Sequence, residues 1–306
     1  MAHLRPVFLL CVLYSFAAAP PAVAPRDADV VGFDADENGA VVVAARIDGA
    51  GPFRLLLDTG SSHSAVGDGL ARRLGLHAVA KAEIMSATGQ SMRPIVRLGR
   101  TAVGGAARDG LLASVLPSAD LGRLGTNVDG VLGQDFLGDF DYTLDYLHGR
   151  LTWTADETIE QPAARLMLAA EGGRFLATLP QGAGRGIVRL VPDTGSAALV
   201  IFGPSLAGGG GALRLLPASG QAQLRGVAGE RTVERAFVQA LRVGGLVMHN
   251  EPAVVVERPA SATVHADGLL PLHRFARVSF NARERCLLIW GRWRTANGDD
   301  GHSSRQ

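Results

Sequence analysis

The chain has 306 residues, of which 47% are hydrophobic, and its 30 Lys and Arg residues against 29 Asp and Glu residues give a formal net charge of +1. This length allows two domains of ordinary size. The near balance of charge, without a basic block, lacks the electrostatic footprint of a nucleic-acid-binding protein, so no nucleic acid is expected as a partner.

Residues 1–24 predict an export signal. Arg5 precedes an apolar run at 7–19 that is shorter than a membrane span and ends in small residues. The tripeptide Ser-Phe-Ala at 15–17 is a candidate cleavage site, and an uncleaved N-terminal anchor is the alternative. We therefore expect an exported protein, periplasmic or secreted, that contacts a membrane only if the anchor is retained.

The next segment is predicted to be β-rich and to end in an acidic turn. Apolar and β-branched clusters predict a hairpin at 30–47, and a turn with Gly and Pro leads into a strand at 53–57. The tetrapeptide Asp-Thr-Gly-Ser follows at 58–61. Because Gly60 can adopt backbone angles closed to other residues, Asp58 is expected at a tight turn beside a buried sheet.

The remainder of the first half contains a predicted helix, a hairpin and further strands. Residues 69–76 predict a short helix that ends at Gly75. A polar tip at 86–91 lies between apolar arms and predicts a hairpin. The sequence Asp-Gly-Val-Leu-Gly at 129–133 then precedes strands at 141–153.

The second half repeats this order after a polar linker at 154–165. A strand pair at 175–191 leads into a second Asp-Thr-Gly-Ser at 193–196. A hairpin tip follows at 224–230, and Asp-Gly-Leu-Leu-Pro at 267–271 parallels the Asp-Gly segment of the first half. Duplication explains a repeated order better than chance does.

The matching layout predicts two tandem units, 28–153 and 166–293, followed by a disordered tail at 294–306. An approximate two-fold axis between the units would bring Asp58 and Asp193 together. Two adjacent carboxyls share one proton, because like charges at close range do not both ionise cheaply. The ionised member can then act as a general base on water and the protonated member as a general acid.

The two Asp-Thr-Gly-Ser segments resemble the active-site loops of aspartic proteases, and each half resembles the retroviral-type (retropepsin-like) unit more closely than a pepsin lobe. The resemblance extends from about Val30 to Trp290. It implies an all-β fold of two tandem β-barrel units related by a pseudo-two-fold axis. It also implies an aspartic endopeptidase that hydrolyses a peptide or protein substrate.

The same resemblance implies a role for each residue of the two loops. Asp58 and Asp193 would hold the attacking water between them. In each loop the Gly amide would donate to a carboxylate, the Thr would tie the loops together, and the Ser hydroxyl would donate to an outer carboxylate oxygen, favouring activity in acid. The loop residues with these supporting roles are Thr59, Gly60, Ser61, Thr194, Gly195 and Ser196.

Two further elements of the resembled family can be placed. The hairpin tip at Thr88, Gly89 and Gln90 corresponds to the flap, which closes over substrate and excludes water. No Tyr of the pepsin kind lies near this tip, which favours the retropepsin-like comparison. Gly133 corresponds to a glycine that crosses behind the catalytic loop, where a side chain would collide with the Asp-bearing turn.

Two prolines break the pattern in the second half. Pro192 removes a backbone donor just before Asp193, and Pro271 stands where the supporting glycine would be. We expect a monomer with one intramolecular Asp pair. Two alternatives stay open, namely a protease active only as a homodimer through Asp58, and a non-catalytic peptide-binding or scaffold protein of the cell envelope.

Other chemistries have little support in the sequence. His63 and its neighbouring serines lie too close in sequence to Asp58 to reach the geometry of a Ser-His-Asp triad. Cys286 lies in an alternating apolar run, which is typical of a buried strand thiol. No His/Cys set has metal-ligand spacing, so neither a metal nor another cofactor is expected.

Overall fold

The computed structural model describes residues 30–35, 39–86, 88–124, 127–155, 160–181, 186–203, 213–257 and 265–291. The predicted export signal at 1–24 and the predicted tail at 294–306 lie outside these residues, as does part of the predicted linker. Within the described ranges, no helix has the length and apolar character needed to cross a bilayer.

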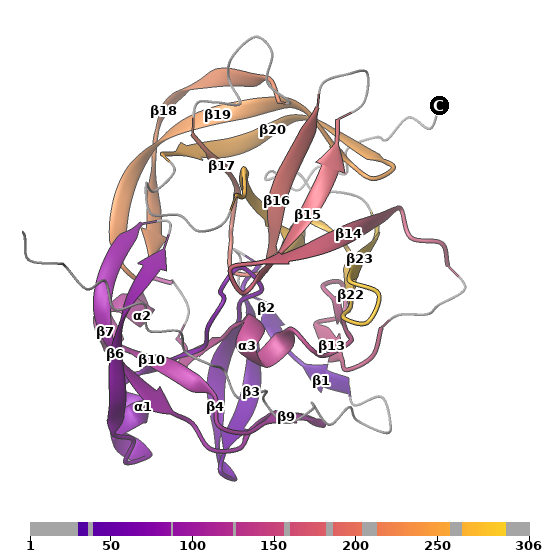
Figure 1. The fold of residues 1–306 in the computed structure, drawn as a ribbon. Coiled ribbons are helices and arrows are strands. Elements are labelled where there is room, and N and C mark those ends of the chain that lie inside the picture. Colours follow the sequence, from indigo (N-terminus) through magenta and orange to yellow (C-terminus); the bar gives the residue numbers. More distant parts are fainter. Residues whose placement is uncertain are drawn as a thin grey trace, which may run out of the picture.

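The fold is all-β, as predicted, and its strands form two large sheets (Figure 1). The ten-stranded sheet comprises β2 (Asp34–Ala35), β3 (Val41–Ile47), β4 (Ala50–Leu57), β5 (Ala65–Gly67), β6 (Ala78–Ser86), β7 (Gly89–Arg97), β8 (Thr101–Val103), β9 (Ala106–Arg108), β10 (Leu112–Leu116) and β11 (Gly130–Leu132). The helices of the described chain are short: α1 (Asp68–Arg73), α2 (Ser118–Gly122), α3 (Gln134–Leu137) and a 3-10 turn at Leu272–Arg274.

The thirteen-stranded sheet contains strands from both halves of the chain. Its members are β1 (Val30–Gly32), β12 (Tyr142–Asp145), β13 (Arg150–Thr152), β14 (Ala164–Glu171), β15 (Arg174–Pro180), β16 (Ile187–Asp193), β17 (Leu199–Phe202), β18 (Leu215–Gly226), β19 (Gly229–Val243), β20 (Leu246–Val256), β21 (Gly268–Pro271), β22 (Arg277–Asn281) and β23 (Cys286–Trp290). Cys286 is fully buried in its strand, as expected.

The strand that leads to Asp58 is buried on both faces. β4 lies between β3 and the parallel strand β11, with Leu56 opposite Val131. Leu55 and Leu57 point into the main core, whereas Leu56 packs in a smaller apolar cluster on the other face. Because side chains alternate along a strand, a continuous apolar run is what two covered faces require. The end of β4 is therefore held rigidly.

The second half builds the same local arrangement around Asp193. β16 pairs with β15 on one side and runs parallel to β21 on the other, with Val191 opposite Leu269. The register matches the first half, where the corresponding pair is Leu56 and Val131. Both Asp loops thus emerge from equivalent positions of two related strand sets, which agrees with the predicted duplication.

The predicted closed barrels are not found. In the thirteen-stranded sheet the order begins β1, β13, β12, β22, β23, β14, so strands from both predicted units pair side by side. β1, which we expected to form a hairpin at 30–47, pairs with β13 instead, and only β2 and β3 form that hairpin. The units are joined where β12 of the first pairs with β22 of the second, and neither sheet closes on itself.

Other local predictions are confirmed. The tip at 86–91 joins β6 and β7 in an antiparallel hairpin, and the tip at 224–230 joins β18 and β19. α1 occupies the predicted helix, and Gly75 after it has φ +62°, a conformation that favours glycine. In Figure 1 the β18–β19 hairpin arches from the second half towards the β6–β7 hairpin of the first.

Candidate active site

The two threonines of the Asp-Thr-Gly-Ser loops bind each other's backbone. The Thr59 amide donates to Thr194 Oγ1 and the Thr194 amide donates to Thr59 Oγ1, both at 3.0 Å. The hydroxyls then donate onward, Thr59 Oγ1 to the Pro192 carbonyl at 2.8 Å and Thr194 Oγ1 to the Leu57 carbonyl at 2.6 Å. Both threonines are 1% exposed. The predicted tie between the loops is therefore present, and it is reciprocal.

Each loop holds its own carboxylate with backbone amides. Asp58 Oδ1 accepts from the Gly60 amide at 2.9 Å and from the Ser61 amide at 3.0 Å. Asp193 Oδ1 accepts from the Gly195 amide at 2.7 Å. These bonds fix one oxygen of each carboxyl.

The two glycines also allow the loops to approach. A Cβ on Gly60 would lie 2.5 Å from Asp193 Cγ, and a Cβ on Gly195 would lie 2.9 Å from Asp58 Cγ. Each glycine therefore packs directly against the carboxyl of the opposite loop. No larger residue fits at either position without moving the carboxyls.

The serine hydroxyls behave differently from the prediction. Ser61 Oγ donates to the His63 carbonyl and Ser196 Oγ donates to the Ala198 carbonyl, both at 2.8 Å. A hydroxyl has one proton to donate, so neither Ser can also donate to a carboxylate oxygen. The prediction was wrong because the turn after each Gly brings a backbone carbonyl within hydrogen-bonding distance of the hydroxyl, which uses its one proton there. The serines shape the turns.

The electrostatics of the two aspartates are unequal. Burial raises the pKa of Asp58, whereas the Gly60 amide and a hydrogen bond from Asp193 lower it. Burial also raises the pKa of Asp193, well above its usual range, and the Asp58 charge raises it further. Asp193 is 5% exposed, while Asp58 is only partly buried. The pKa of both aspartates is raised, and the stronger rise at Asp193 favours Asp193 as the carrier of the shared proton and Asp58 as the ionised partner.

The Asp58 loop has a polar support from the chain around Gly133. Ser64 donates its amide and its hydroxyl to Asp135, at 3.0 and 2.7 Å, and its hydroxyl accepts from the Gly133 amide. The Gln134 side chain donates to the Thr59 carbonyl at 2.9 Å. Sequence reasoning did not single out Ser64, Gln134 or Asp135, because nothing local marks a buried serine or amide as part of a site.

A family comparison can now be added to this geometry. The family model described as aspartyl protease matches residues 43–136 and again residues 183–272, which together span more than half of the chain. The chain belongs to the aspartyl protease family. A search of curated proteins found no match.

The two family matches in this aspartyl protease each contain one Asp-Thr-Gly-Ser loop and one Asp-Gly segment, in agreement with two tandem units. The catalytic roles of Asp58 and Asp193 remain predictions. In the described part of the chain, no three His, Cys, Asp or Glu side chains are grouped closely enough to hold a metal ion.

The two prolines are accommodated in the second unit. Pro192 lies inside β16, opposite Leu270 of β21, and its carbonyl accepts the Thr59 hydroxyl. Pro271 lies opposite Asp193 at the end of β21. The first unit has Gly133 there, where a Cβ would lie 2.7 Å from the His63 backbone. The loss of these donors and of the glycine leaves the strand pairing around Asp193 intact.

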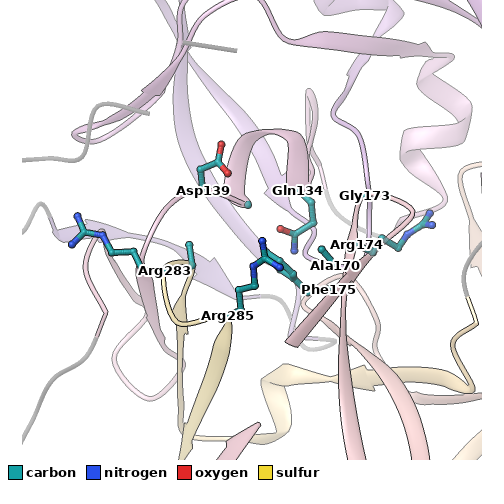
Figure 2. Close-up of a pocket in the computed structure, with 10 residues that line it drawn as sticks. Gln134, Asp139, Ala170, Gly173, Arg174, Phe175, Arg283 and Arg285 are labelled. Atoms are coloured by element: carbon teal, nitrogen blue, oxygen red, sulfur yellow. The ribbon is translucent and has the colours of Figure 1, made fainter. Parts of the chain in front are cut away.

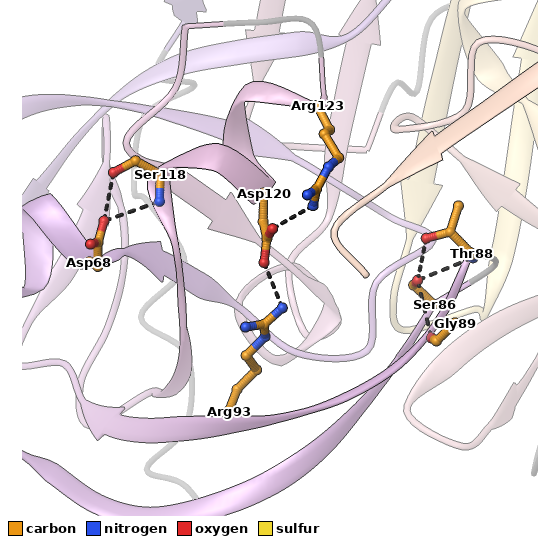
Figure 3. A network of polar contacts seen from close by, with 8 residues as sticks. All are labelled: Asp68, Ser86, Thr88, Gly89, Arg93, Ser118, Asp120 and Arg123. Atoms are coloured by element: carbon orange, nitrogen blue, oxygen red, sulfur yellow. Dashed lines mark hydrogen bonds and ion pairs between the residues drawn. The ribbon is translucent and has the colours of Figure 1, made fainter. Parts of the chain in front are cut away.

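The tips of the two hairpins meet. A Cβ on Gly226 would lie 2.8 Å from Thr88 Oγ1, and a Cβ on Gly89 would lie 3.8 Å from Ala228 Cβ. Thr88 also accepts or donates a hydrogen bond with Ser86 Oγ at 3.0 Å (Figure 3). Contact between tips from both units fits the retropepsin-like comparison. That Thr88, Gly89 and Gln90 bind substrate stays a prediction.

One charged residue at the site was missed by sequence reasoning. Arg174, the first residue of β15, donates from Nε to the Gly60 carbonyl at 2.7 Å. Its charge lowers the pKa of both Asp58 and Asp193. It also lines a cavity of about 390 Å³ together with Gln134 and Phe175, and Figure 2 shows its side chain pointing away from that cavity. No sequence motif connects Arg174 to a loop that is more than a hundred residues away.

Proposed function

We propose that this aspartyl protease is an endopeptidase with one intramolecular active site at the junction of its two units. The reciprocal hydrogen bonds of Thr59 and Thr194 are the observation on which the proposal rests. They tie together two loops of the same chain, so that Asp58 and Asp193 form a pair without a second molecule. This favours the monomer over the homodimer.

The reaction assigns a different task to each carboxyl. Asp58, the ionised member, would accept a proton from water as its oxygen attacks the carbonyl carbon of the peptide bond. Asp193 would give its proton to the carbonyl oxygen, which produces a neutral gem-diol. Collapse of the gem-diol with proton transfer to the amide nitrogen breaks the C–N bond and releases the two peptides. The chemistry needs only these two carboxyls and water.

The substrate would be a peptide or an unfolded protein segment in extended conformation. Two hairpins that meet at their tips can close over such a chain, and their strand edges can add backbone hydrogen bonds. Folded proteins present few segments of this kind, so denatured proteins are the better first substrate.

The test is cleavage of a denatured protein and a peptide library between acid and neutral pH. We expect wild-type activity in acid, and a loss of at least about a hundredfold in Asp58→Asn and in Asp193→Asn, as is usual for a general acid or base. Asp109→Asn, at an exposed aspartate, is the control for the Asp-to-Asn substitution itself.

Each alternative gives a distinct result in that experiment. Activity that depends on Asp58 but not on Asp193, with dimers in analytical ultracentrifugation, would establish the homodimer. Peptide binding without cleavage by folded wild-type protein at every pH would replace the protease with a binding module.

A further inference from the structure

Arg174 reaches the first active-site loop from the second unit. It follows a two-glycine turn between β14 and β15, in which Gly173 has φ +73°. This turn packs against the first loop, since a Cβ on Gly173 would lie 3.0 Å from the Ser62 Cβ. The Arg174 Nε then donates to the Gly60 carbonyl at 2.7 Å. This contact thus joins a residue of the second unit to the active-site loop of the first unit.

The guanidinium of Arg174 has no carboxylate partner of its own. Within the described residues it forms no ion pair within 4.0 Å, and the charged groups that act on its pKa are the active-site carboxyls. Burial lowers the pKa of Arg174, and the charges of Asp58 and Asp193 raise it again. An arginine stays protonated even so, because its pKa starts very high. A permanent positive charge is therefore held beside the pair.

At the position of the first unit that matches Arg174, the described chain has no cation. Gly39 has φ +78° and packs against the second unit at His273, as Gly173 packs against Ser62. The residue after Gly39 is Ala40, in the place that Arg174 takes after Gly173. The charge therefore stands on one side only, and it interacts more strongly with Asp58 than with Asp193.

We propose that Arg174 is a positioning residue that anchors the Asp58 loop from the second unit and keeps Asp58 the ionised member of the pair. The inference rests on the proposed protease function and adds that Arg174 sets the pH range in which the protease is active. Arg174 touches the loop backbone, and neither the scissile bond nor the water needs to contact it.

The other titratable groups around the pair do not supply this charge. Tyr146, from the turn after β12, lies near Asp193, and burial keeps its phenol neutral by raising its pKa. His63, next to the first loop, lowers the pKa of the buried Asp135 carboxyl rather than that of Asp58. Arg174 is the only cation among the groups that shift the pKa of Asp58 in the described chain.

The first test is the pH dependence of kcat/KM for peptide cleavage. In Arg174→Gln the acid limb of this pH profile, where activity falls as Asp58 is protonated, should move to higher pH by about one unit. Removal of a nearby positive charge makes Asp58 harder to ionise. Arg174→Lys keeps the charge and should return the limb towards the wild-type position. Arg283→Gln, at an exposed arginine that lies across the same cavity from Arg174, is the control (Figure 2). An unmoved limb in Arg174→Gln, or an equal movement in the control, would overturn the proposal.

A second measurement does not depend on activity. The carboxyl 13C resonance of Asp58 can be titrated in the Asp193→Asn background, with Arg174 present and with Arg174→Gln. We expect the Asp58 midpoint to rise in the Gln variant, and an unchanged midpoint would refute the inference even if the enzyme cleaves peptides. A raised midpoint, together with a wild-type protein that cleaves no peptide, would retain the role of Arg174 and reject the protease.

Discussion

At the scale of single residues, the unusual feature is a buried acid held next to another acid. Asp193 is 5% exposed, and burial together with the Asp58 charge raises its pKa. The folded protein therefore retains a proton that the unfolded chain releases above pH of about 4. Stability is fully present below that pH and falls as the pH rises towards the raised value, by up to about 1.4 kcal/mol for each pH unit.

Asp193→Asn should remove this loss, since an amide has no proton to release. We expect the free energy of unfolding of the variant to depend less on pH between 4 and 7, and to exceed that of wild type at pH 7 by about 1 kcal/mol or more. Chemical denaturation at a series of pH values measures it. Asp109→Asn, at an exposed site, should retain the wild-type slope. A steeper slope in Asp193→Asn would contradict the assignment.

At the scale of elements, the β6–β7 hairpin is anchored by buried charges. Arg93 of β7 donates to Asp120 of α2 at 2.5 Å, and Arg123 binds the other oxygen of the same carboxylate (Figure 3). The Asp120 side chain is 8% exposed and that of Arg93 is 19% exposed. A pair this buried becomes costly when one partner is removed, because the remaining charge has lost its compensation.

Asp120→Asn should therefore loosen the β6–β7 hairpin. We expect its free energy of local opening to fall by about 1–3 kcal/mol, which corresponds to amide hydrogen exchange about 5- to 150-fold faster in β7. Asp68→Asn is a neighbouring control, because Asp68 binds Ser118 of the same helix without contacting the hairpin (Figure 3). Equal acceleration in both variants would show that α2, rather than the ion pair, holds the hairpin.

At the scale of the whole molecule, the two units form one folding unit. β12 of the first half pairs with β22 of the second, and Tyr142 stacks on Phe280 across that pairing with ring centroids 4.8 Å apart. The main apolar core also contains residues from both halves. Separate unfolding of either unit would expose this shared interior, so one cooperative transition is expected.

Phe280→Ala should lower the free energy of unfolding by about 3–5 kcal/mol, since a fully buried aromatic ring is lost from the junction. The transition should remain single in calorimetry. Phe237→Ala is the matched control, because that ring is 39% exposed on β19 and its loss should cost much less. Two separate transitions in either wild type or Phe280→Ala would show that the units are independent.

The sequence by itself determined the parts that depend on neighbouring residues. An apolar strand followed by Asp-Thr-Gly-Ser specifies a carboxylate at a tight turn, and its repetition at 58–61 and 193–196 indicated the duplication. The β6–β7 hairpin and α1 also followed from local patterns. The Thr tie and the Gly amides also followed, because the family resemblance supplied the axis that relates the loops.

Only the tertiary structure decided what depends on distant contacts. The inter-unit sheet replaced the expected barrels, because strand partners are chosen by packing across the whole chain. The Ser61 hydroxyl donates to the His63 carbonyl instead of a carboxylate. The local sequence pattern does not show which of these two acceptors the hydroxyl binds. Arg174 reached Gly60 because the fold brings the β14–β15 turn against the first loop. The residue type determines which hydrogen bonds a side chain is able to form. The fold determines which of those partners lie close enough to bind.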